Sequence, residues 1–218
     1  MRIGIIAAME KEIKKYQEIY DLKKINEIFD IYEGKFQNKI ILLCVCGIGK
    51  VNAAATTQHF IDQYQVDCII NSGCAGSLIE SVKVLDTIIA SYVTYHDFTP
   101  IRVMKECVPQ HGRIQPDQKL TEMTINILKK QKTNYQLGGI CSGDCFVTSS
   151  KKRDQIYQET SCLAVDMESA SIGHIATKNK VPFIIIRSIS DFADGVTEQE
   201  EKAANISAFI VQELVSNL

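Results

Sequence analysis

Continuous runs of apolar residues recur along the 218-residue chain, separated by segments in which polar residues predominate. A short run of this kind predicts a strand that is buried on both faces of a sheet. Such runs lie at residues 3–8, 40–46, 68–71, 162–165 and 183–186, and residues 84–93 are predicted to form a further strand. Residues 28–36 alternate between apolar and polar side chains, which predicts a half-buried antiparallel strand. A further strand, with a glycine break, is predicted at residues 138–147.

Segments with helical character follow most of these runs. They lie at residues 9–20, 119–132, 149–159 and 166–176, with an alanine-rich helix after the glycine turn at Gly47 and a last helix from about Thr197 to Leu218. This alternation predicts a single α/β domain over residues 1–218, a three-layer fold with a mixed, mostly parallel central β-sheet flanked by helices. Residues 98–117 contain three prolines and no clear periodicity, so we expect a long functional or mobile loop.

The composition is that of an ordinary globular protein, with 45% hydrophobic and 23% charged residues. The formal net charge is −2 and no long basic run occurs, so nucleic-acid binding is not expected. No apolar run reaches the roughly 18 residues of a membrane span, and the N-terminus resembles a first strand more than a signal peptide. We therefore expect no membrane association.

The eight cysteines bear on redox environment and on metal binding. They form no C-x-x-C pair, and most lie in apolar runs, where cysteine behaves as a small buried hydrophobe. The four histidines show no metal-ligand spacing either. The sequence therefore predicts free thiols in a reducing cytoplasm, with no disulfide framework, no metal and no cofactor.

The apolar run at residues 183–186 leads directly into charged and hydroxyl side chains, among them Arg187, Ser190 and Asp191. Because unpaired buried charge is costly, a core strand that ends in this way needs an explanation. Arg187 and Asp191 could pair and cap the strand, or they could belong to a ligand site beyond the carboxyl end of the sheet. Glu12 allows the same alternatives: a first-turn acid on an exposed helix, or a group over the end of the first strand.

Two glycine-rich segments also follow predicted strands. Residues 47–57 lack the spacing of a P-loop or a dinucleotide fingerprint, but they allow close backbone approach and direct a helix N-terminus towards a ligand. Residues 72–77, S-G-C-A-G-S, are predicted to form a turn, which is either a plain tight turn or one wall of a site.

Short motifs stand at these strand ends. They are I-G-I-I-x-A-M-x-x-E from Ile3, G-I-G-K-V-N-A-A from Gly47, I-I-N-S-G-x-A-G from Ile69, Y-H-D from Tyr95, S-G-D-x-F from Ser142, M-E from Met167 and R-S-I-S-D from Arg187. In this order they resemble the purine nucleoside phosphorylase and uridine phosphorylase superfamily, and within it the 5′-methylthioadenosine/S-adenosylhomocysteine nucleosidases. Each motif is weak alone, whereas the whole series, spread over nearly the full chain, favours a site over the purely structural alternatives.

The resemblance implies a nucleoside phosphorylase-like fold and a hydrolase that cleaves the N-glycosidic bond of adenine nucleosides. The implied substrates are 5′-methylthioadenosine, S-adenosylhomocysteine and 5′-deoxyadenosine. Adenine leaves poorly as an anion, and Asp191, steadied by Ser190, matches the acid that protonates its five-membered ring. Glu12 matches the general base that activates water for attack on the anomeric carbon, with Arg187 helping to orient it.

The other matched positions are implied substrate contacts. Glu168 matches the acceptor for the ribose hydroxyls, Met167 packs against the sugar, and Phe146 stacks on the adenine. The remaining predicted contacts are Met9, Ile48, Cys74 and Val147. The family also implies a homodimer in which the loop after Asp97 caps the neighbouring pocket. A small-molecule purine nucleoside and a second copy of the chain are thus the expected partners.

Three features depart from the family pattern. Cys74 and Asp166 stand where serine and glutamate are usual, and residues 98–115 lack the aromatic and glycine pattern that closes over the 5′-thioalkyl group. The 5′ substituent is therefore open, and a nucleosidase for another 6-aminopurine nucleoside, such as aminodeoxyfutalosine, is an alternative. A nucleoside phosphorylase and a non-catalytic nucleoside-binding protein are further alternatives.

Two observations weigh against these last alternatives. Asn71 stands where related phosphorylases carry an arginine, and a phosphate nucleophile needs such a cation, so water is favoured. A pure binding protein has no use for an acid and a base, yet both Glu12 and Asp191 are present.

Overall fold

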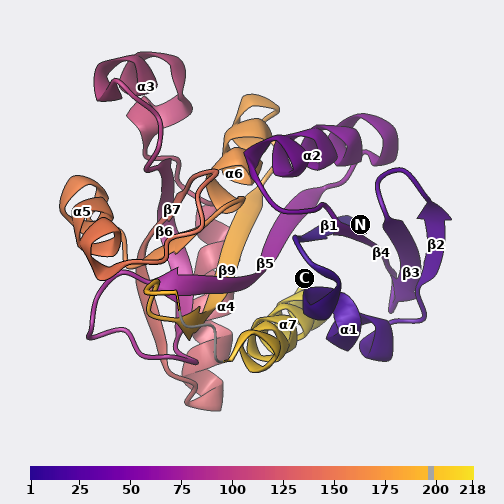
Figure 1. The fold of residues 1–218 in the computed structure, drawn as a ribbon. Helices are drawn as coiled ribbons and strands as arrows, with labels where there is room; N and C mark the ends of the chain where they lie inside the picture. The colour runs from indigo at the N-terminus through magenta and orange to yellow at the C-terminus, as the bar shows by residue number, and fades with distance from the viewer. Residues whose placement is uncertain (196–198) are drawn as a thin grey trace.

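The predicted strands form one mixed sheet in the computed structural model, which describes residues 1–195 and 199–218 (Figure 1). In this described part the strands are β1 (Arg2–Ala7), β2 (Lys23–Asn26), β3 (Ile31–Phe36), β4 (Lys39–Val45), β5 (Cys68–Ser77), β6 (Thr87–Tyr95), β7 (Tyr135–Ser142), β8 (Ala164–Asp166) and β9 (Phe183–Asp191). The sheet order is β2-β3-β4-β1-β5-β8-β7-β6-β9, with an additional β5–β9 pairing. The ladders β1–β4, β1–β5, β5–β9, β6–β7 and β7–β8 are parallel, and the other ladders are antiparallel, as the predicted fold class requires.

The pairing of β5 with β9 closes part of the sheet on itself. Strands β5, β8, β7, β6 and β9 each pair with the next, and β9 returns to β5, so they form a ring. The other strands extend from β5 as an open arm. Because β1, β5 and β9 are parallel neighbours, their carboxyl ends meet at one edge of the sheet, where ligands of α/β proteins bind.

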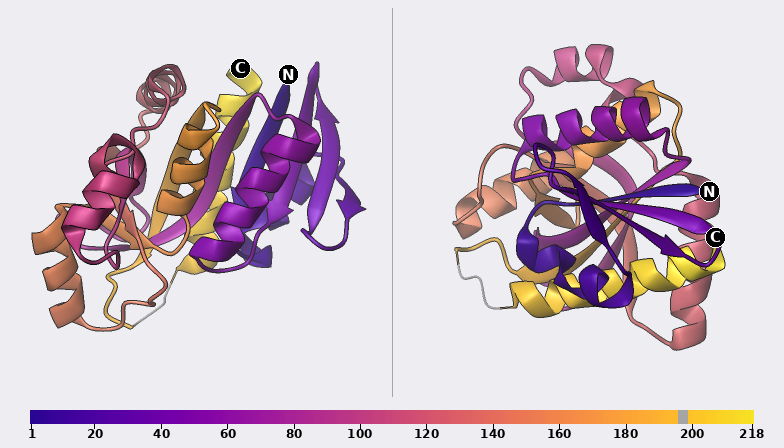
Figure 2. Two further views of the ribbon diagram at one scale, coloured as in Figure 1. Left: turned by 90° about the horizontal axis from the view of Figure 1, so that it is seen from above. Right: turned by 90° about the vertical axis from the view of Figure 1, so that its right-hand side faces the viewer.

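Helices cover both faces of the sheet (Figure 2). They are α1 (Glu10–Ile19), α2 (Lys50–Tyr64), α3 (Ile101–Cys107), the 3₁₀ helix η1 (Pro109–Gly112), α4 (Gln118–Gln131), α5 (Ser150–Thr160), α6 (Ser169–Lys178) and α7 (Glu200–Asn217). Helices α2 and α6 pack together on one face, and α1, α4 and α7 pack together on the other. The packing is tight: a Cβ atom at Gly4 of β1 would lie 2.7 Å from the ring of Phe60 on α2.

Two strands run further than their apolar sequences predict. Residues 72–77 are not a turn but the second half of β5, and β9 continues through Arg187 to Asp191. The two halves pair with each other, with Gly73 opposite Arg187 and Cys74 opposite Ser188. Polar side chains are tolerated in these buried strands because the ring of strands satisfies the backbone while hydrogen bonds and ion pairs satisfy the side chains.

The predicted loop at residues 98–117 is partly helical, which corrects the sequence interpretation. It contains α3 and η1, with Pro100 as the N-cap of α3 and Pro109 at the start of η1. Proline is compatible with a helix start because the first N–H groups of a helix have no intrahelical partner. The prolines therefore mark helix starts here and not the absence of helices.

Smaller differences concern element ends. The strand predicted from residue 28 begins at Ile31, and the polar edge strand β2 was not predicted. Strand β7 ends at Ser142, so residues 143–147 form a loop after it. Thr197, the predicted start of the last helix, lies outside the described residues, and α7 is described from Glu200. Among the described helices, none is both long and apolar enough to cross a membrane.

Candidate active site

A pocket opens at the carboxyl ends of β1, β5 and β9, beside β8. Its lining consists of Ala8, Met9, Glu12, Ile48, Cys74, Ala75, Gly76, Cys145, Phe146, Val147, Val165, Asp166, Met167, Glu168, Arg187, Ser190, Asp191, Ala193 and Glu200. Each residue predicted as catalytic or substrate-binding belongs to this lining. Residues far apart in the sequence therefore meet in one place.

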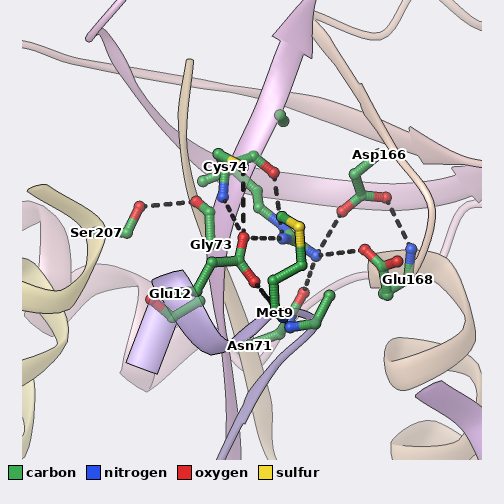
Figure 3. Close-up of polar contacts among 12 residues, drawn as sticks. Met9, Glu12, Asn71, Gly73, Cys74, Asp166, Glu168 and Ser207 are labelled. Carbon is green, nitrogen blue, oxygen red and sulfur yellow. Dashed lines mark hydrogen bonds and ion pairs between the residues drawn. The ribbon is translucent and has the colours of Figure 1, made fainter. Parts of the chain in front are cut away.

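Glu12 lies at the floor of the pocket and not on an exposed helix face. Its side chain is 1% exposed, because it reaches back from the first turn of α1 to the backbone N–H groups of Ala8 and Met9, just after the end of β1. Oε2 accepts hydrogen bonds from the N–H groups of Ala8 at 2.8 Å and Met9 at 3.1 Å, and Oε1 accepts one from Cys74 N–H at 2.9 Å (Figure 3). Backbone N–H groups therefore hold both oxygens of Glu12 in a fixed orientation.

Arg187 is buried beneath the pocket among carboxylates. Its Nη2 lies 2.8 Å from Asp166 Oδ2 and 3.4 Å from Glu168 Oε2, whereas Nη1 lies 3.9 Å from Glu12 Oε1. Burial alone would lower the pKa of Arg187, but these three carboxylates raise it above its usual value. Within the described residues Arg187 makes no ion pair with Asp191, so the strand-capping explanation is wrong.

Glu168 faces the pocket from the N-cap of α6. Its Oε1 accepts a hydrogen bond from Gly49 N–H at 2.9 Å, and the residue is 4% exposed. Burial raises the pKa of Glu168 to about 7, although Arg187 and the Gly49 N–H group act in the opposite direction. Its neighbour Asp166 accepts bonds from Ser142 Oγ and from Ser169, so the shorter acid at this position is fully engaged by the protein.

Asp191 ends β9 on another side of the pocket. Oδ2 accepts a hydrogen bond from Ser190 Oγ at 2.6 Å, and Oδ1 accepts one from Ala193 N–H at 2.8 Å. The residue is 9% exposed. Both oxygens are thus held in place by its own segment of chain, while the carboxyl group still lines the pocket.

The rest of the wall is largely apolar. Phe146 and Ile48 are 57% and 53% exposed, which is unusual for large apolar side chains in a folded monomer, and both line the open side of the pocket. Met9, Val147 and Met167 complete this surface. Such a wall can stack on a flat heterocycle and pack against a sugar.

The charge of the lining is strongly unbalanced. Among the described residues, Arg187 is its only cation, and it is already surrounded by Glu12, Asp166 and Glu168. Asn71 lies just outside the lining. Its Oδ1 accepts a hydrogen bond from Arg187 Nη2 at 2.9 Å, and its amide N–H donates to a backbone carbonyl. The pocket therefore favours a ligand that carries or develops positive charge.

Cys74 touches the floor of the pocket. Its Sγ donates to Glu12 Oε1 at 3.4 Å. Burial and the neighbouring Glu12 raise the pKa of the Cys74 thiol, so the thiol form is favoured over the thiolate. The described lining contains no histidine that could act as a base towards it.

Some contributions were not predicted from the sequence. The N–H groups of Gly49 and Ala193 hold the two carboxyl groups of Glu168 and Asp191, and Ser169 bridges Asp166, Asn71 and Arg187. Backbone N–H groups occur at nearly every position, so the sequence does not show which of them bind a side chain. The exception is Ala193, which follows Asp191 so closely that a local hydrogen bond could have been predicted. No cluster of His, Cys, Asp and Glu in the described residues could hold a metal ion.

Comparisons with known proteins find relatives over nearly the whole chain. The model of the phosphorylase superfamily matches residues 2–216. A 5′-methylthioadenosine/S-adenosylhomocysteine nucleosidase of Buchnera aphidicola is 38% identical over 225 residues, covering 100% of this chain and 96% of the relative. That of Staphylococcus epidermidis is 35% identical over 227 residues, covering 99% and 100%.

Solved structures are similar over the whole fold. A Helicobacter pylori 5′-methylthioadenosine/S-adenosylhomocysteine nucleosidase in complex with butyl-thio-DADMe-Immucillin-A superposes with a TM-score of 0.94 at 31% identity, covering 100% of this chain and 99% of the other. A futalosine hydrolase of Helicobacter pylori has a TM-score of 0.94 at 30% identity, covering 100% and 98%.

Proposed function

The chain belongs to the phosphorylase superfamily, and we propose that it is an N-glycosyl hydrolase that releases adenine from nucleosides. Its substrates are 5′-methylthioadenosine and S-adenosylhomocysteine, with 5′-deoxyadenosine as a further one. Full-length similarity to nucleosidases of this name supports the assignment. The observation that carries it is the lining itself: an acid and a base, Asp191 and Glu12, in an apolar pocket whose only described cation is neutralised.

In this proposal Asp191 is the general acid. Adenine leaves readily only when its five-membered ring is protonated, and Asp191 lies at the pocket wall with its carboxyl group oriented by Ser190 and the Ala193 N–H. The exposed ring of Phe146 and the backbone of Val147 border the same space, which suits the flat base. The acid is thereby directed at the edge of a stacked purine.

Glu12 is the general base for the attacking water. Its three backbone donors hold it rigidly. Arg187 Nη1, at 3.9 Å from Oε1, makes a longer contact with Glu12 than these backbone N–H groups do. Arg187 acts mainly on Asp166 and Glu168, which modifies the expected role of orienting Glu12. As the bond breaks, the ribose gains oxocarbenium character, and the carboxylates below it stabilise that charge.

Glu168 receives the ribose hydroxyls, and Met167 packs on the sugar. An ionised carboxylate has acceptors for both hydroxyls. Among the described residues, Glu168 Oε2 is engaged only by the long 3.4 Å contact to Arg187. Ile48 and Met9 border the remaining wall. This leaves an apolar space for the 5′ substituent of the nucleoside.

Water is the better nucleophile for this pocket than phosphate. A phosphate dianion needs free cationic donors, and Arg187 is already paired with carboxylates. Coulomb repulsion from Glu12, Asp166 and Glu168 would oppose its entry. A phosphorylase is therefore disfavoured, and the presence of both acid and base disfavours a protein that only binds.

A second candidate is a nucleosidase for aminodeoxyfutalosine. The specific observation is the 30% identity and TM-score of 0.94 to the futalosine hydrolase of Helicobacter pylori. The open side of the pocket, where Phe146 and Ile48 are half exposed, could receive a 5′ group larger than methylthio.

The assembly and location follow as parts of the same proposal. The protein forms a homodimer, supported by α3, which projects from the body of the molecule and leaves Ile101 55% exposed (Figure 1). The location is a reducing cytoplasm, supported by eight free cysteines, of which Cys107 and Cys145 are exposed.

A product assay tests the activity. Purified protein is incubated with 5′-methylthioadenosine, S-adenosylhomocysteine, 5′-deoxyadenosine and aminodeoxyfutalosine, with and without inorganic phosphate, and released adenine is measured. We expect adenine from the first two at a rate independent of phosphate. Turnover that requires phosphate identifies a phosphorylase, and nucleoside affinity without adenine release identifies a binding protein.

A further inference from the structure

Three charged residues outside the pocket lining join two loops that carry its walls. Lys50 N–H donates to Asp144 Oδ1 at 2.8 Å, and Lys50 Nζ donates to Asp97 Oδ2 at 2.5 Å. The backbone N–H of Asp144 donates to the same Asp97 oxygen at 2.9 Å. We call Lys50, Asp97 and Asp144 the Lys50 clamp. It ties the start of α2 to the loop that follows β7.

Each end of the clamp is directly adjacent to a pocket wall. Ile48 and Gly49 precede Lys50, whereas Phe146 and Val147 follow Asp144 by a few residues, and Ile48, Phe146 and Val147 line the pocket. The clamp therefore sets the distance between the wall assigned to the purine, at Phe146 and Val147, and the wall at Ile48. It also sets the position of the Gly49 N–H group.

The N-terminus of α2 is shared by two carboxylates. Gly49 N–H donates to Glu168 Oε1 at 2.9 Å, and the next N–H group, that of Lys50, donates to Asp144 Oδ1 at 2.8 Å. Gly49 has φ 103°, a conformation that favours glycine, and it turns these successive N–H groups outwards. The dipole of the 15-residue helix favours negative charge at this end. One acid belongs to the proposed site, and the other lies outside it.

We propose that Asp144 is a positioning residue for Glu168. By accepting the Lys50 N–H bond it fixes the first turn of α2, and this holds the Gly49 N–H group against the carboxylate that receives the ribose hydroxyls. Asp97 and the Lys50 ammonium hold Asp144 in turn. The inference rests on the proposed function, because it assigns a ribose-binding role to Glu168.

A purely stabilising role explains the clamp less well. The side chains of Lys50, Asp97 and Asp144 are 24%, 27% and 49% exposed, and ion pairs at such positions contribute little to folding. Their contacts are nevertheless short and connect backbone groups next to the site. This arrangement favours control of local geometry over global stability.

The clamp also affects the ionisation of Glu168. The charged and titratable groups that face Glu168 are Arg187 from β9, Asp166 from β8, Glu12 from α1 and Cys46 after β4. Burial raises its pKa to about 7, and the Gly49 N–H bond counteracts this. Loss of that bond would raise the pKa further. The ribose hydroxyls need the ionised form of Glu168. As the pH is lowered, the variant would therefore lose activity at a higher pH than the wild type does.

A double-mutant cycle tests the proposal through kcat, KM and pH profiles of adenine release. Asp144→Ala should lower kcat/KM for 5′-methylthioadenosine by roughly tenfold, mainly through KM, and move the acidic limb to higher pH. Asp144→Asn keeps the oxygen that accepts the Lys50 N–H bond and should restore near-normal values. Asp62→Ala removes an exposed acid from α2, away from the clamp, and serves as the control.

The decisive comparison uses Glu168→Gln as the background. If Asp144 acts through Glu168, adding Asp144→Ala to this variant should lower kcat/KM by less than about twofold. The reason is that the residue at position 168 no longer titrates and its function is already impaired. A further tenfold loss in that background, or an unchanged acidic limb in Asp144→Ala, overturns the proposal. Wild-type turnover in the same assay separates this failure from failure of the proposed function, and thermal unfolding excludes misfolding of the variants.

Discussion

Asp191 is the residue on which leaving-group departure depends in the proposed reaction. We expect Asp191→Asn to remove nearly all turnover, because an amide cannot deliver a proton, and loss of a general acid typically costs about 10²–10⁴-fold. The asparagine oxygen can still accept from Ser190 or Ala193, so folding should be retained. Adenine release in single turnover measures the effect. A folded variant with more than about a tenth of the wild-type rate would refute protonation by Asp191.

Glu12 is expected to act on water and not on the nucleoside. Glu12→Gln should therefore leave nucleoside binding largely intact while turnover falls sharply. The structure adds a second expectation. Glutamine has one acceptor oxygen, so its NH₂ group must face a backbone donor of Ala8 and Met9 or of Cys74, and the variant should be less stable by about 1–3 kcal/mol.

Calorimetric titration and thermal unfolding check these two effects of Glu12→Gln. Binding measured with 5′-methylthioadenosine should persist below the unfolding temperature of the variant. If affinity falls in proportion to the rate, Glu12 is instead a substrate-holding or structural residue.

Cys74 contacts Glu12, the proposed general base, but is not expected to be a nucleophile. We expect Cys74→Ser to keep activity or raise it, since a hydroxyl is a better hydrogen-bond partner for the attacking water and for Glu12 than the thiol at 3.4 Å. The raised pKa of the thiol argues against a thiolate. The rate of the serine variant decides, because a hundredfold fall, about 2.7 kcal/mol of barrier, would establish a role for sulfur.

At the level of elements, the close approach of β5 to α1 determines the site. Glycine at position 73 makes it possible, because a Cβ atom there would overlap Glu12 Oε1 and Arg187 Nη1. Gly73→Ala should therefore displace the base and lower kcat by at least roughly a hundredfold, with loss of stability from overpacking. Ser77→Ala in the same strand removes buried hydrogen bonds to Ile79 and Val82 and is the control.

Turnover and thermal unfolding of these two variants separate geometry from stability. Ser77→Ala should lose stability with little change in kcat, whereas Gly73→Ala should lose both. Comparable kcat losses in the two variants would mean that β5 acts only as a scaffold.

At the level of the whole molecule, the expected homodimer can be tested through α3. Met104 is buried within the chain, whereas Ile101 is 55% exposed on this projecting helix. Ile101→Asp should shift the protein towards monomer and reduce activity, because a charge would be buried against the partner. Ile28→Asp, at a side chain that is 90% exposed on another part of the surface, is the matched control.

Sedimentation equilibrium at micromolar concentration, combined with activity at each concentration, measures this effect. A wild-type monomer with full activity would contradict the homodimer. Equal behaviour of the Ile101 and Ile28 variants would exclude α3 from the interface.

The amino-acid sequence by itself determined the type and order of most elements. Apolar runs predicted strands such as β1 and β9, because burial on both faces leaves no polar position free. It also predicted residues that line the pocket, since Glu12, Glu168 and Asp191 stand at strand ends or just beyond them. The strands depend on residues that are close in sequence, so local pattern is sufficient to find them. The site residues were singled out only by the family resemblance of the whole series of motifs.

Only the tertiary structure decided what those residues contact. Arg187 could have paired with Asp191, four positions away, but it is held by Asp166 and Glu168 from other elements. Likewise, the Gly49 N–H group reaches Glu168 across 119 positions of sequence. Electrostatic and hydrogen-bond energies depend on distance in space and on burial, and both are set only when the ring of strands closes.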